Sequence, residues 1–419
     1  MKFRSIKGTK DILPDESGTW QAVERTIRDV MHVFNYKEIR TPVFEETALF
    51  ARGIGELTDI VGKEMYTFDD RGGTSLTLKP EMTASVIRAY IQHQLGEQQP
   101  LTKVYYIAPM FRQERPQAGR LRQFHQFGAE AIGGQQPAID AEIVALCVEV
   151  YRQLEIDNVE LRINSVGCET CRPVYKEKLK KFLRPRLDDL SEESKRRFDQ
   201  NPLRILDSKD EDDRALTKGA PLLIDHLCEI CGAHFNGVMR ALKSLGIAFE
   251  IDGRIVRGLD YYTKTAFELI GKELGSQDAL VGGGRYDLLV KELGGKQTPA
   301  VGFAAGIERL LMVLGKQKKR VGAVVRPTVF IVAADNSSRD HALREAAVLR
   351  RAGVSCEIDL LERSLKSQMR EADRQRAENV IVLGEREIQS NEVAVKNMQT
   401  GEERRIALSQ LIDFFTKPR

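Results

Sequence analysis

The chain has 419 residues, of which 42% are hydrophobic and 30% are charged, so it is expected to fold into two or three domains rather than to remain disordered. Its net charge is only +3, from 64 basic and 61 acidic residues, so nucleic-acid binding would have to come from local basic patches. No apolar run approaches roughly 18 residues, which argues against a membrane span. No apolar stretch follows the charged start Met1–Lys7, which argues against a secretory signal, so a cytoplasmic protein is expected.

The N-terminal part of the sequence is predicted to alternate helices with strands. Residues 17–34 have the apolar spacing of an amphipathic helix, and Pro80–Thr83 has the composition of a helix start. The β-prone segments 102–109 and 124–132 flank an arginine-rich stretch, which predicts a hairpin. Helices are expected over residues 17–34, 84–94 and 140–154, and strands over 36–43, 102–109, 124–132 and 159–165. Short strands are also expected within 56–79, around the turn Asp69–Gly73.

The arginine-rich stretch Arg112–Arg122 contains four arginines and one glutamate. It could be an ordinary solvated loop. Arginine at this density, interrupted by proline and glycine, more often binds phosphate groups, because the guanidinium group presents a planar fork of donors. The stretch is therefore a candidate phosphate-binding loop.

From Cys168 to Cys231 charged residues dominate, helical periodicity returns and strand-like patterns disappear, which predicts a helical insertion. Two Cys-x-x-Cys pairs bound this segment, Cys168/Cys171 and Cys228/Cys231. In a reducing cytosol such pairs suggest the thiolate ligands of a tetrahedral zinc ion, although the distance between the pairs exceeds that of a zinc ribbon. Unligated thiols are the alternative.

The most informative motif lies within the strand-like segment 248–270, where Arg257 and Asp260 precede the adjacent residues Tyr261 and Tyr262. Successive side chains of a strand point to opposite faces, so one tyrosine would face the core and the other a polar cleft. The alternative is an ordinary amphipathic strand in which buried tyrosines only pack.

Small residues mark the next two segments. Gly282–Gly284, after a predicted strand at 279–283, would let another group approach the backbone, although a tight turn is the simpler interpretation. Gly302–Leu310 is predicted to open a helix, with Arg309 near its start. That guanidinium group could meet an anion or form an ion pair, for example with Glu308.

Residues 317–322 are predicted to be a linker, and the sequence beyond Pro327 alternates strands with helices. Such alternation implies a small mixed or parallel sheet flanked by helices. The strands are expected at 329–333, 354–360 and 380–383, and the helices at 341–352 and 365–376.

Several polar residues are placed to share one face of the hairpin. Gln126 and Glu130 are four residues apart, and even spacing on a strand places them on the same side. Arg112 at the end of the other strand could join them. Solvated surface carboxylates would be the usual alternative, but Phe124 and Phe127 indicate a partly buried strand.

Together these segments resemble the three signature motifs of class II aminoacyl-tRNA synthetases, and specifically the histidyl-tRNA synthetase family. Motif 1 resembles the helix and strand ending at Pro42, motif 2 resembles Phe111–Glu130, and motif 3 resembles Gly302–Leu310. Three further segments are similar to the histidine-specific signatures of the family: Leu78–Thr83, Arg257–Tyr262 and Gly283–Asp287. The resemblance runs essentially from end to end.

The resemblance implies an α+β protein that activates L-histidine with ATP and Mg²⁺ and esterifies the terminal adenosine of tRNA(His), as a homodimer. It implies an antiparallel-sheet catalytic domain formed by residues 1–166 and 232–322, a helical insertion at 167–231, and a C-terminal α/β anticodon-binding domain at 326–419.

The resemblance also implies a histidine pocket made of hydrogen-bonding groups, which can demand an imidazole where an apolar slot could not. Glu81, Thr83 and Gln126 would hold the ammonium group. Glu130 and Tyr262 would read the imidazole. The residues implied to bind histidine are Glu81, Met82, Thr83, Arg112, Gln126, Glu130, Arg257, Tyr261, Tyr262 and Tyr286.

The residues implied to bind ATP are Arg112, Glu114, Arg120, Phe124 and Arg309. Arg112 would bind the α-phosphate, Arg120 and Arg309 the outer phosphates, and Phe124 would stack on adenine. Arg257 would clamp the reacting carboxylate and α-phosphate, where other class II enzymes place a metal ion, so Arg257 and Arg112 are the implied catalytic residues. Arg115 and Gln117 would meet the acceptor end of the tRNA.

Two features depart from the most familiar bacterial pattern. Met82 stands where glycine is frequent, and the paired cysteines are not a general requirement of the family. The competing interpretation is the histidine-sensing regulatory subunit of ATP phosphoribosyltransferase, which resembles these synthetases. That protein typically lacks the anticodon-binding domain and the Arg/Tyr-Tyr motif, and this chain has both. A non-catalytic tRNA sensor would need a kinase domain for which the chain has no room.

Overall fold

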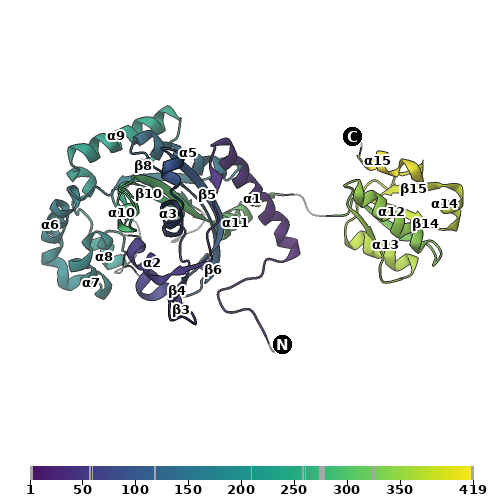
Figure 1. Cartoon of the computed structure of the whole chain (residues 1–419), viewed down its shortest axis with the longest axis horizontal. Coiled ribbons are helices and arrows are strands. Elements are labelled where there is room, and N and C mark those ends of the chain that lie inside the picture. Colours follow the sequence, from purple (N-terminus) through teal and green to yellow (C-terminus); the bar gives the residue numbers. More distant parts are fainter. Residues whose placement is uncertain are drawn as a thin grey trace. The chain divides into compact units, whose positions relative to one another are not determined.

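The computed structural model describes residues 3–55, 58, 60–117, 119–208, 210–256, 259, 261–272, 279–322 and 326–416. The chain divides into two compact units, Met1–Gly322 and Ala323–Arg419 (Figure 1). Among the described residues, the first unit contains two sheets and the second unit one, and each unit has its own hydrophobic cores.

Among the described residues, eight strands form one large sheet in the first unit. Its centre is antiparallel from β5 through β6, β11, β10 and β9 to β7, and short parallel strands close the two edges. The strands, in spatial order, are β1 (Lys37–Glu38), β5 (Thr102–Phe111), β6 (Gln123–Ile132), β11 (Ala300–Gly306), β10 (Ala279–Arg285), β9 (Thr263–Gly271), β7 (Val159–Ser165) and β8 (Glu250–Ile251). The predicted hairpin and the predicted antiparallel sheet are confirmed.

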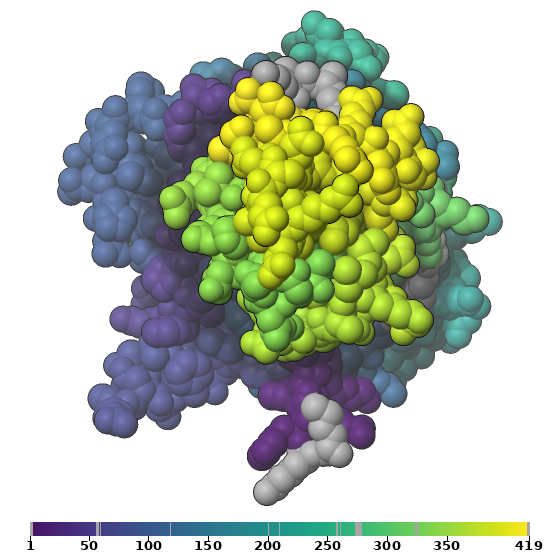
Figure 2. All heavy atoms as spheres, turned by 90° about the vertical axis from the view of Figure 1, so that its right-hand side faces the viewer, coloured from purple at the N-terminus to yellow at the C-terminus, as the bar shows by residue number. Residues whose placement is uncertain are grey.

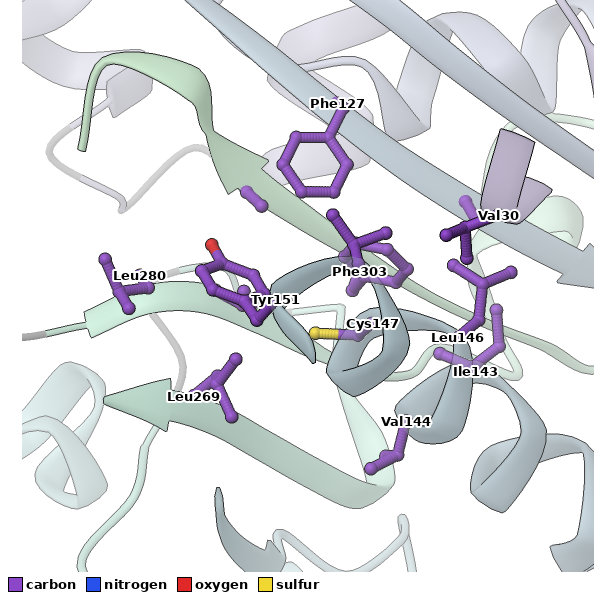
Figure 3. Close-up of a cluster of buried hydrophobic side chains, with 14 of the residues drawn as sticks. Val30, Phe127, Ile143, Val144, Leu146, Cys147, Tyr151, Leu269, Leu280 and Phe303 are labelled. Atoms are coloured by element: carbon purple, nitrogen blue, oxygen red, sulfur yellow. The ribbon is translucent and has the colours of Figure 1, made fainter. Parts of the chain in front are cut away.

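The large sheet separates two cores because alternate strand residues point to opposite faces. In β5, Tyr105 packs with helices α1 (Pro14–Val33), α5 (Pro137–Gln153), α9 (Glu229–Ser244) and α11 (Ile307–Lys316). Figure 3 shows part of this core, in which the rings of Phe127 and Phe303 meet edge to face at 5.9 Å. On the opposite face, Val104 and Tyr106 pack with α3 (Thr83–Gln92) and α10 (Leu289–Glu292).

The three strands of a second, smaller sheet precede α3 in the sequence. Strand β4 (Ser75–Leu78) pairs on either side with β2 (Phe44–Glu46) and β3 (Tyr66–Asp69). The turn predicted at Asp69–Gly73 joins β3 to β4, and the Asp70 carboxylate accepts hydrogen bonds from the Gly72 and Thr74 N–H groups, both at 2.8 Å. The rest of the predicted strand region is different, because Ile60–Glu64 forms a π-helical turn after α2 (Thr47–Ile54). A short helix, α4 (Leu95–Gln98), follows α3.

The segment between the two cysteine pairs is helical in its described residues, as predicted. It forms a separate core around Tyr175, Leu179 and Ile205. The Asp213 carboxylate ties its turns together by accepting hydrogen bonds from the hydroxyl groups of three serines at 2.6–2.7 Å. The elements are α6 (Cys171–Leu183), η2 (Arg184–Asp189), α7 (Glu192–Gln200), η3 (Pro202–Ile205), α8 (Glu211–Leu216) and η4 (Leu223–His226).

Two further predictions of secondary structure are wrong. Residues 300–306 form the central strand β11, so the helix predicted from Gly302 begins only at Ile307. Small residues are present there because the neighbouring strands leave little space, not because the segment is a helix start. Strand β9 begins at Thr263, so Tyr261 and Tyr262 precede the strand that was expected to contain them.

The glycines of Gly282–Gly284 also lie within a strand, β10, rather than in a turn. A Cβ atom on Gly283 would lie 2.4 Å from the Phe267 ring and 2.7 Å from the Gly302 carbonyl oxygen. Glycine is therefore required there for close packing of adjacent strands.

The second unit, green to yellow in Figure 2, contains a sheet of five described strands in the order β13-β12-β14-β15-β16. Its βαβ part is confirmed, with β12 parallel to both neighbours, whereas β15 and β16 extend the sheet in the antiparallel sense and were not predicted. The elements are β12 (Val329–Ala333), α12 (Arg339–Arg351), β13 (Cys356–Ile358), α13 (Leu365–Arg374), β14 (Asn379–Leu383), α14 (Glu385–Ser390), β15 (Glu392–Asn397), β16 (Glu403–Ala407), η6 (Leu408–Gln410) and α15 (Leu411–Thr416). In the described parts of both units, no helix has the length and apolar character needed to cross a bilayer.

Candidate active site

A cavity of about 230 Å³ opens on the α3 side of the large sheet, over strands β6, β10 and β11. It collects residues that are far apart in the sequence, because antiparallel neighbours bring their polar side chains to one surface. The sequence-predicted residues that line it are Glu81, Thr83, Arg112, Glu114, Arg120, Phe124, Gln126, Tyr261, Tyr262, Tyr286 and Arg309.

Glu130 lies directly behind one end of this cavity and is fully buried. The Thr83 hydroxyl donates to its Oε1 atom at 2.8 Å, and the Tyr286 hydroxyl donates to its Oε2 atom. Burial raises the pKa of Glu130 to about 8, a rise that these two hydrogen bonds oppose and the nearby Glu81 carboxyl increases. The carboxyl group is therefore poised to change its charge near neutral pH.

Glu81 and Gln126 provide two more polar groups at the same end. The Glu81 carboxylate accepts hydrogen bonds from the Thr83 and Ala84 N–H groups at 2.7 and 2.8 Å, so it satisfies the start of α3. Burial nevertheless raises its pKa. Gln126 Oε1 is buried and has no hydrogen-bond partner among the described residues. A buried acceptor without a partner beside a cavity indicates that a ligand donates to it.

Three tyrosines form the wall of this end. The Tyr261 ring lies 4.7 Å from that of Tyr262 and 5.6 Å from that of Tyr286, measured between ring centroids. Tyr261 and Tyr262 both line the cavity, so the expectation that they would face opposite sides is wrong. They precede β9, and the alternation of a strand does not apply to them.

Arginines gather at the other end of the cavity. Arg120 and Arg112 approach the Glu114 carboxylate at 3.3 and 3.6 Å, and the Arg112 guanidinium lies 5.2 Å from the centre of the Phe124 ring. Burial and the positive charges of Arg120 and Arg112 lower the pKa of Arg309, which Glu114 partly opposes. Cations that destabilise one another in this way favour binding of a polyanion.

The loop after β5 folds back so that Arg120 reaches the cavity. Gln117 and Arg120 exchange backbone hydrogen bonds at 2.9 and 3.1 Å, and Gly119 between them has φ = +75°, a conformation that favours glycine. Arg115 and Gln117 are exposed on this loop, and Gln117 lines a second cavity of about 560 Å³ beside α1 and α11.

Of the described residues predicted to bind histidine, ATP or tRNA, four do not line the first cavity: Glu130, which lies behind it, Arg115 and Gln117 on the exposed loop, and Met82. Met82 is buried in the core against α3, where its sulfur lies 3.5 Å from the Thr41 hydroxyl. Arg257, together with Gly258 and Asp260 of the same motif, lies outside the described residues.

The four paired cysteines meet at the junction of α6 and α9. Their sulfur atoms all lie within 4.8 Å of one another, and Cys168 Sγ is 3.8 Å from the sulfurs of both Cys171 and Cys228. The helical insertion therefore brings together two pairs that are separated by residues 172–227, as the zinc hypothesis requires.

The sequence did not single out two features of the site. Gly302 pairs with Glu130, and a Cβ atom on it would lie 1.6 Å from Glu130 Oε2. Arg285, beside Tyr286, is fully buried and binds Asp140 of α5, which also contacts His234 of α9. Both could have been noticed in the sequence, because Gly302 and Arg285 each interrupt an otherwise apolar strand pattern.

An antiparallel sheet that carries an arginine cluster beside an acidic, tyrosine-lined pocket, joined to a small α/β unit, is the architecture of a class II aminoacyl-tRNA synthetase. The profile described as "Histidyl-tRNA synthetase" matches residues 8–310, and the profile described as "Anticodon binding domain" matches residues 328–417. The chain belongs to the histidyl-tRNA synthetase family.

Individual relatives agree with this assignment along the whole chain. The histidine–tRNA ligase of Halothermothrix orenii is 50% identical to this chain, and the match covers 100% of both proteins. The histidine–tRNA ligase of Chloroherpeton thalassium is 52% identical, over 100% of this chain and 98% of the relative. The crystal structure of apo Staphylococcus aureus histidyl-tRNA synthetase superposes with a TM-score of 0.84 at 38% identity, over 99% of this chain and 100% of that one. These full-length matches favour a synthetase over the regulatory subunit.

Proposed function

We propose that this protein is a histidine–tRNA ligase. It activates L-histidine with ATP to histidyl-adenylate, releasing pyrophosphate, and transfers the histidyl group to the 3′-terminal adenosine of tRNA(His), releasing AMP. The observation that carries this proposal is a single cavity whose one end offers buried carboxyl, amide and hydroxyl groups and whose other end is lined by three arginines.

The acidic end is the amino-acid pocket. Gln126 Oε1, without a partner among the described residues, accepts from the substrate ammonium group together with Glu81 and Thr83. Glu130 and Tyr262 recognise the imidazole nitrogens, while Tyr261 and Tyr286 form the walls. A side chain that lacks the imidazole nitrogens leaves these buried groups unpaired and is rejected.

The arginine-lined end binds ATP. Arg112 binds the α-phosphate, Arg120 and Arg309 bind the outer phosphates with Glu114 between them, and Phe124 stacks on the adenine. Mg²⁺ bound to the nucleotide supplies further positive charge on the phosphates. The histidine carboxylate oxygen attacks the α-phosphorus as the bond to pyrophosphate breaks, and fixed arginine charges stabilise the charge that develops.

Arg257 is assigned to the reacting carboxylate and α-phosphate on its sequence motif alone. Residues 1–166 and 232–322 make up the proposed catalytic domain, residues 167–231 the insertion and residues 326–419 the anticodon-binding domain. Arg115 and Gln117 on the exposed loop contact the tRNA acceptor end. The active form is a homodimer, as the motif 1 resemblance implies, and it acts in the cytoplasm, where translation enzymes such as its relatives typically work.

Histidine-dependent exchange of pyrophosphate into ATP tests the first step, and charging of tRNA(His) tests the second. Exchange with histidine and Mg²⁺, but not with other amino acids, is the expected result. Histidine binding without any exchange would overturn the proposal and favour the histidine-sensing regulatory protein.

A further inference from the structure

We infer that Cys168, Cys171, Cys228 and Cys231 bind one zinc ion as four thiolates, and that Arg172 connects this site to the loop carrying Tyr262. The metal part of the inference is independent of the proposed function, whereas the effect on histidine binding rests on it.

The sulfur positions fit a tetrahedral zinc site. Zn–S bonds of about 2.3 Å in a tetrahedron place sulfur atoms about 3.8 Å apart. The distances from Cys168 Sγ to the sulfurs of Cys171 and Cys228 are both 3.8 Å. All six cysteines of the chain, each described by the structure, are free, and the spacing is far longer than the roughly 2.05 Å of a disulfide.

Backbone N–H groups point at two of the four sulfur atoms. The Cys228 N–H group points at Cys171 Sγ at 3.0 Å, and the Thr170 N–H group points at Cys168 Sγ at 3.4 Å. Cys171 is the first residue of α6, and Cys231 lies in the first turn of α9. The N-terminal ends of two helices therefore converge on the sulfurs, where their dipoles favour thiolates.

The cluster adjoins the amino-acid pocket through Arg172. Its Nε atom donates to the Val166 carbonyl oxygen at 2.8 Å, and its Nη2 atom donates to the carbonyl oxygen of Tyr262. Next to it, Val166 N–H donates to Lys264 O and Lys264 N–H donates to Gly167 O, both at 2.7 Å. A metal that fixes the start of α6 thereby fixes the backbone of a residue that lines the pocket.

Elemental analysis of protein purified without metal-chelating tags or added chelator tests the metal site. We expect about one zinc per chain in the wild type and in Cys356→Ser, whose cysteine lies in the other unit, and loss of zinc in Cys228→Ser. Replacement by Co²⁺ should give the visible absorption of a tetrahedral thiolate complex. Zinc-free wild-type protein overturns the inference, whether or not Cys228→Ser folds.

The connection to histidine binding is tested with Arg172→Ala. This variant should keep its zinc and its KM for ATP, while the KM for histidine in pyrophosphate exchange rises about tenfold, as expected for loss of a charge-assisted hydrogen bond. Arg172→Lys should restore part of the affinity, and Lys181→Ala, exposed on the same helix, should behave as the wild type. An unchanged histidine KM in Arg172→Ala refutes the connection. Absence of exchange in the wild type refutes the proposed function instead, and leaves the zinc measurement valid.

Discussion

Glu130 is a buried carboxyl group held between hydroxyl groups from two other segments, Thr83 and Tyr286. Because burial raises its pKa to about 8, the group is mostly neutral at pH 7 in the free protein. If the imidazole N–H group of histidine donates to it, as proposed, the complex favours the ionised carboxylate. Histidine binding then releases a proton.

The affinity for histidine should therefore depend on pH through Glu130. Because the complex favours the ionised carboxylate, Glu130 must lose its proton when histidine binds below pH 8. The affinity for histidine should therefore rise by up to about tenfold per pH unit between about pH 6.5 and 8, and it should level off above about pH 8. Calorimetric titration of the wild type and Glu130→Gln over this range measures the effect. The ionisations of free histidine and of Glu81 are common to both proteins, so only the difference in slope is attributed to Glu130. Equal slopes would contradict its titration.

At the scale of secondary-structure elements, the pairing of β6 with β11 places Glu130 opposite a residue without a side chain, which leaves space for the carboxyl group. Gly302 lies opposite Glu130, and any side chain at this position would occupy the space of Glu130 Oε2. Glycine is required at position 302 by the lack of space beside Glu130, and not by a backbone conformation that only glycine adopts.

Gly302→Ala should therefore displace Glu130 and raise the KM for histidine about tenfold or more, the cost of disturbing a buried hydrogen-bonded group. Gly315→Ala is the matched control, because a Cβ atom there meets nothing within 4 Å. Pyrophosphate exchange at varied histidine concentration measures both variants. An unchanged histidine KM in Gly302→Ala would show that the carboxyl group is not needed in its present position.

A second constraint joins β10 to the helices behind the sheet. Arg285 is buried at the end of β10, where its Nη1 atom donates to Asp287 at 3.0 Å and its guanidinium group also binds Asp140. Lys264 binds the other oxygen of Asp287 at 2.8 Å, and His234 contacts Asp140 at 3.1 Å. Removing the arginine leaves the buried Asp140 and the partly buried Asp287 with too little compensating positive charge.

Arg285→Met should reduce the free energy of unfolding of the first unit by about 3–5 kcal/mol, the usual effect of breaking a buried ion pair from one side. Calorimetric unfolding of the full-length protein can follow this unit through its own transition. Lys10→Ala, which removes an ion pair with Glu16 on the protein surface, should change stability by no more than about 0.5 kcal/mol. Similar losses in the two variants would argue against a special contribution from the buried network.

How far these elements could be predicted depends on how local their determinants are. The hairpin of β5 and β6 and the strand β7 follow from patterns within their own residues, and Gln126 and Glu130 could be placed on one face by their spacing alone. In contrast, the glycines and alanines of β11 acquire their meaning only from β6 and β10 on either side. The position of Tyr261 and Tyr262 before β9 likewise depends on where pairing with β7 and β10 begins, which periodicity does not define.

At the scale of the whole molecule, the chain divides into two compact units, and the second of them matches the anticodon-binding domain profile. The described residues that line the candidate active-site cavity belong to the first unit, and the second unit has hydrophobic cores of its own. The repeated βαβ pattern made the second unit predictable, but β15 and β16 were missed because β15 has only two buried residues, Val393 and Val395, and β16 begins with three exposed charged residues.

A fragment of residues 1–322 should therefore fold and catalyse histidine-dependent pyrophosphate exchange at nearly the rate of the full-length protein. Its kcat/KM for tRNA(His) should fall by about a hundredfold or more, because removal of one of two linked binding modules loses the benefit of simultaneous engagement. Both assays are run on the fragment and the full-length protein at the same active-site concentration. Loss of exchange in a folded fragment would show that the second unit supports the catalytic site. Undiminished tRNA charging would show that the second unit does not contribute to tRNA binding, so the two measurements test the division of labour separately.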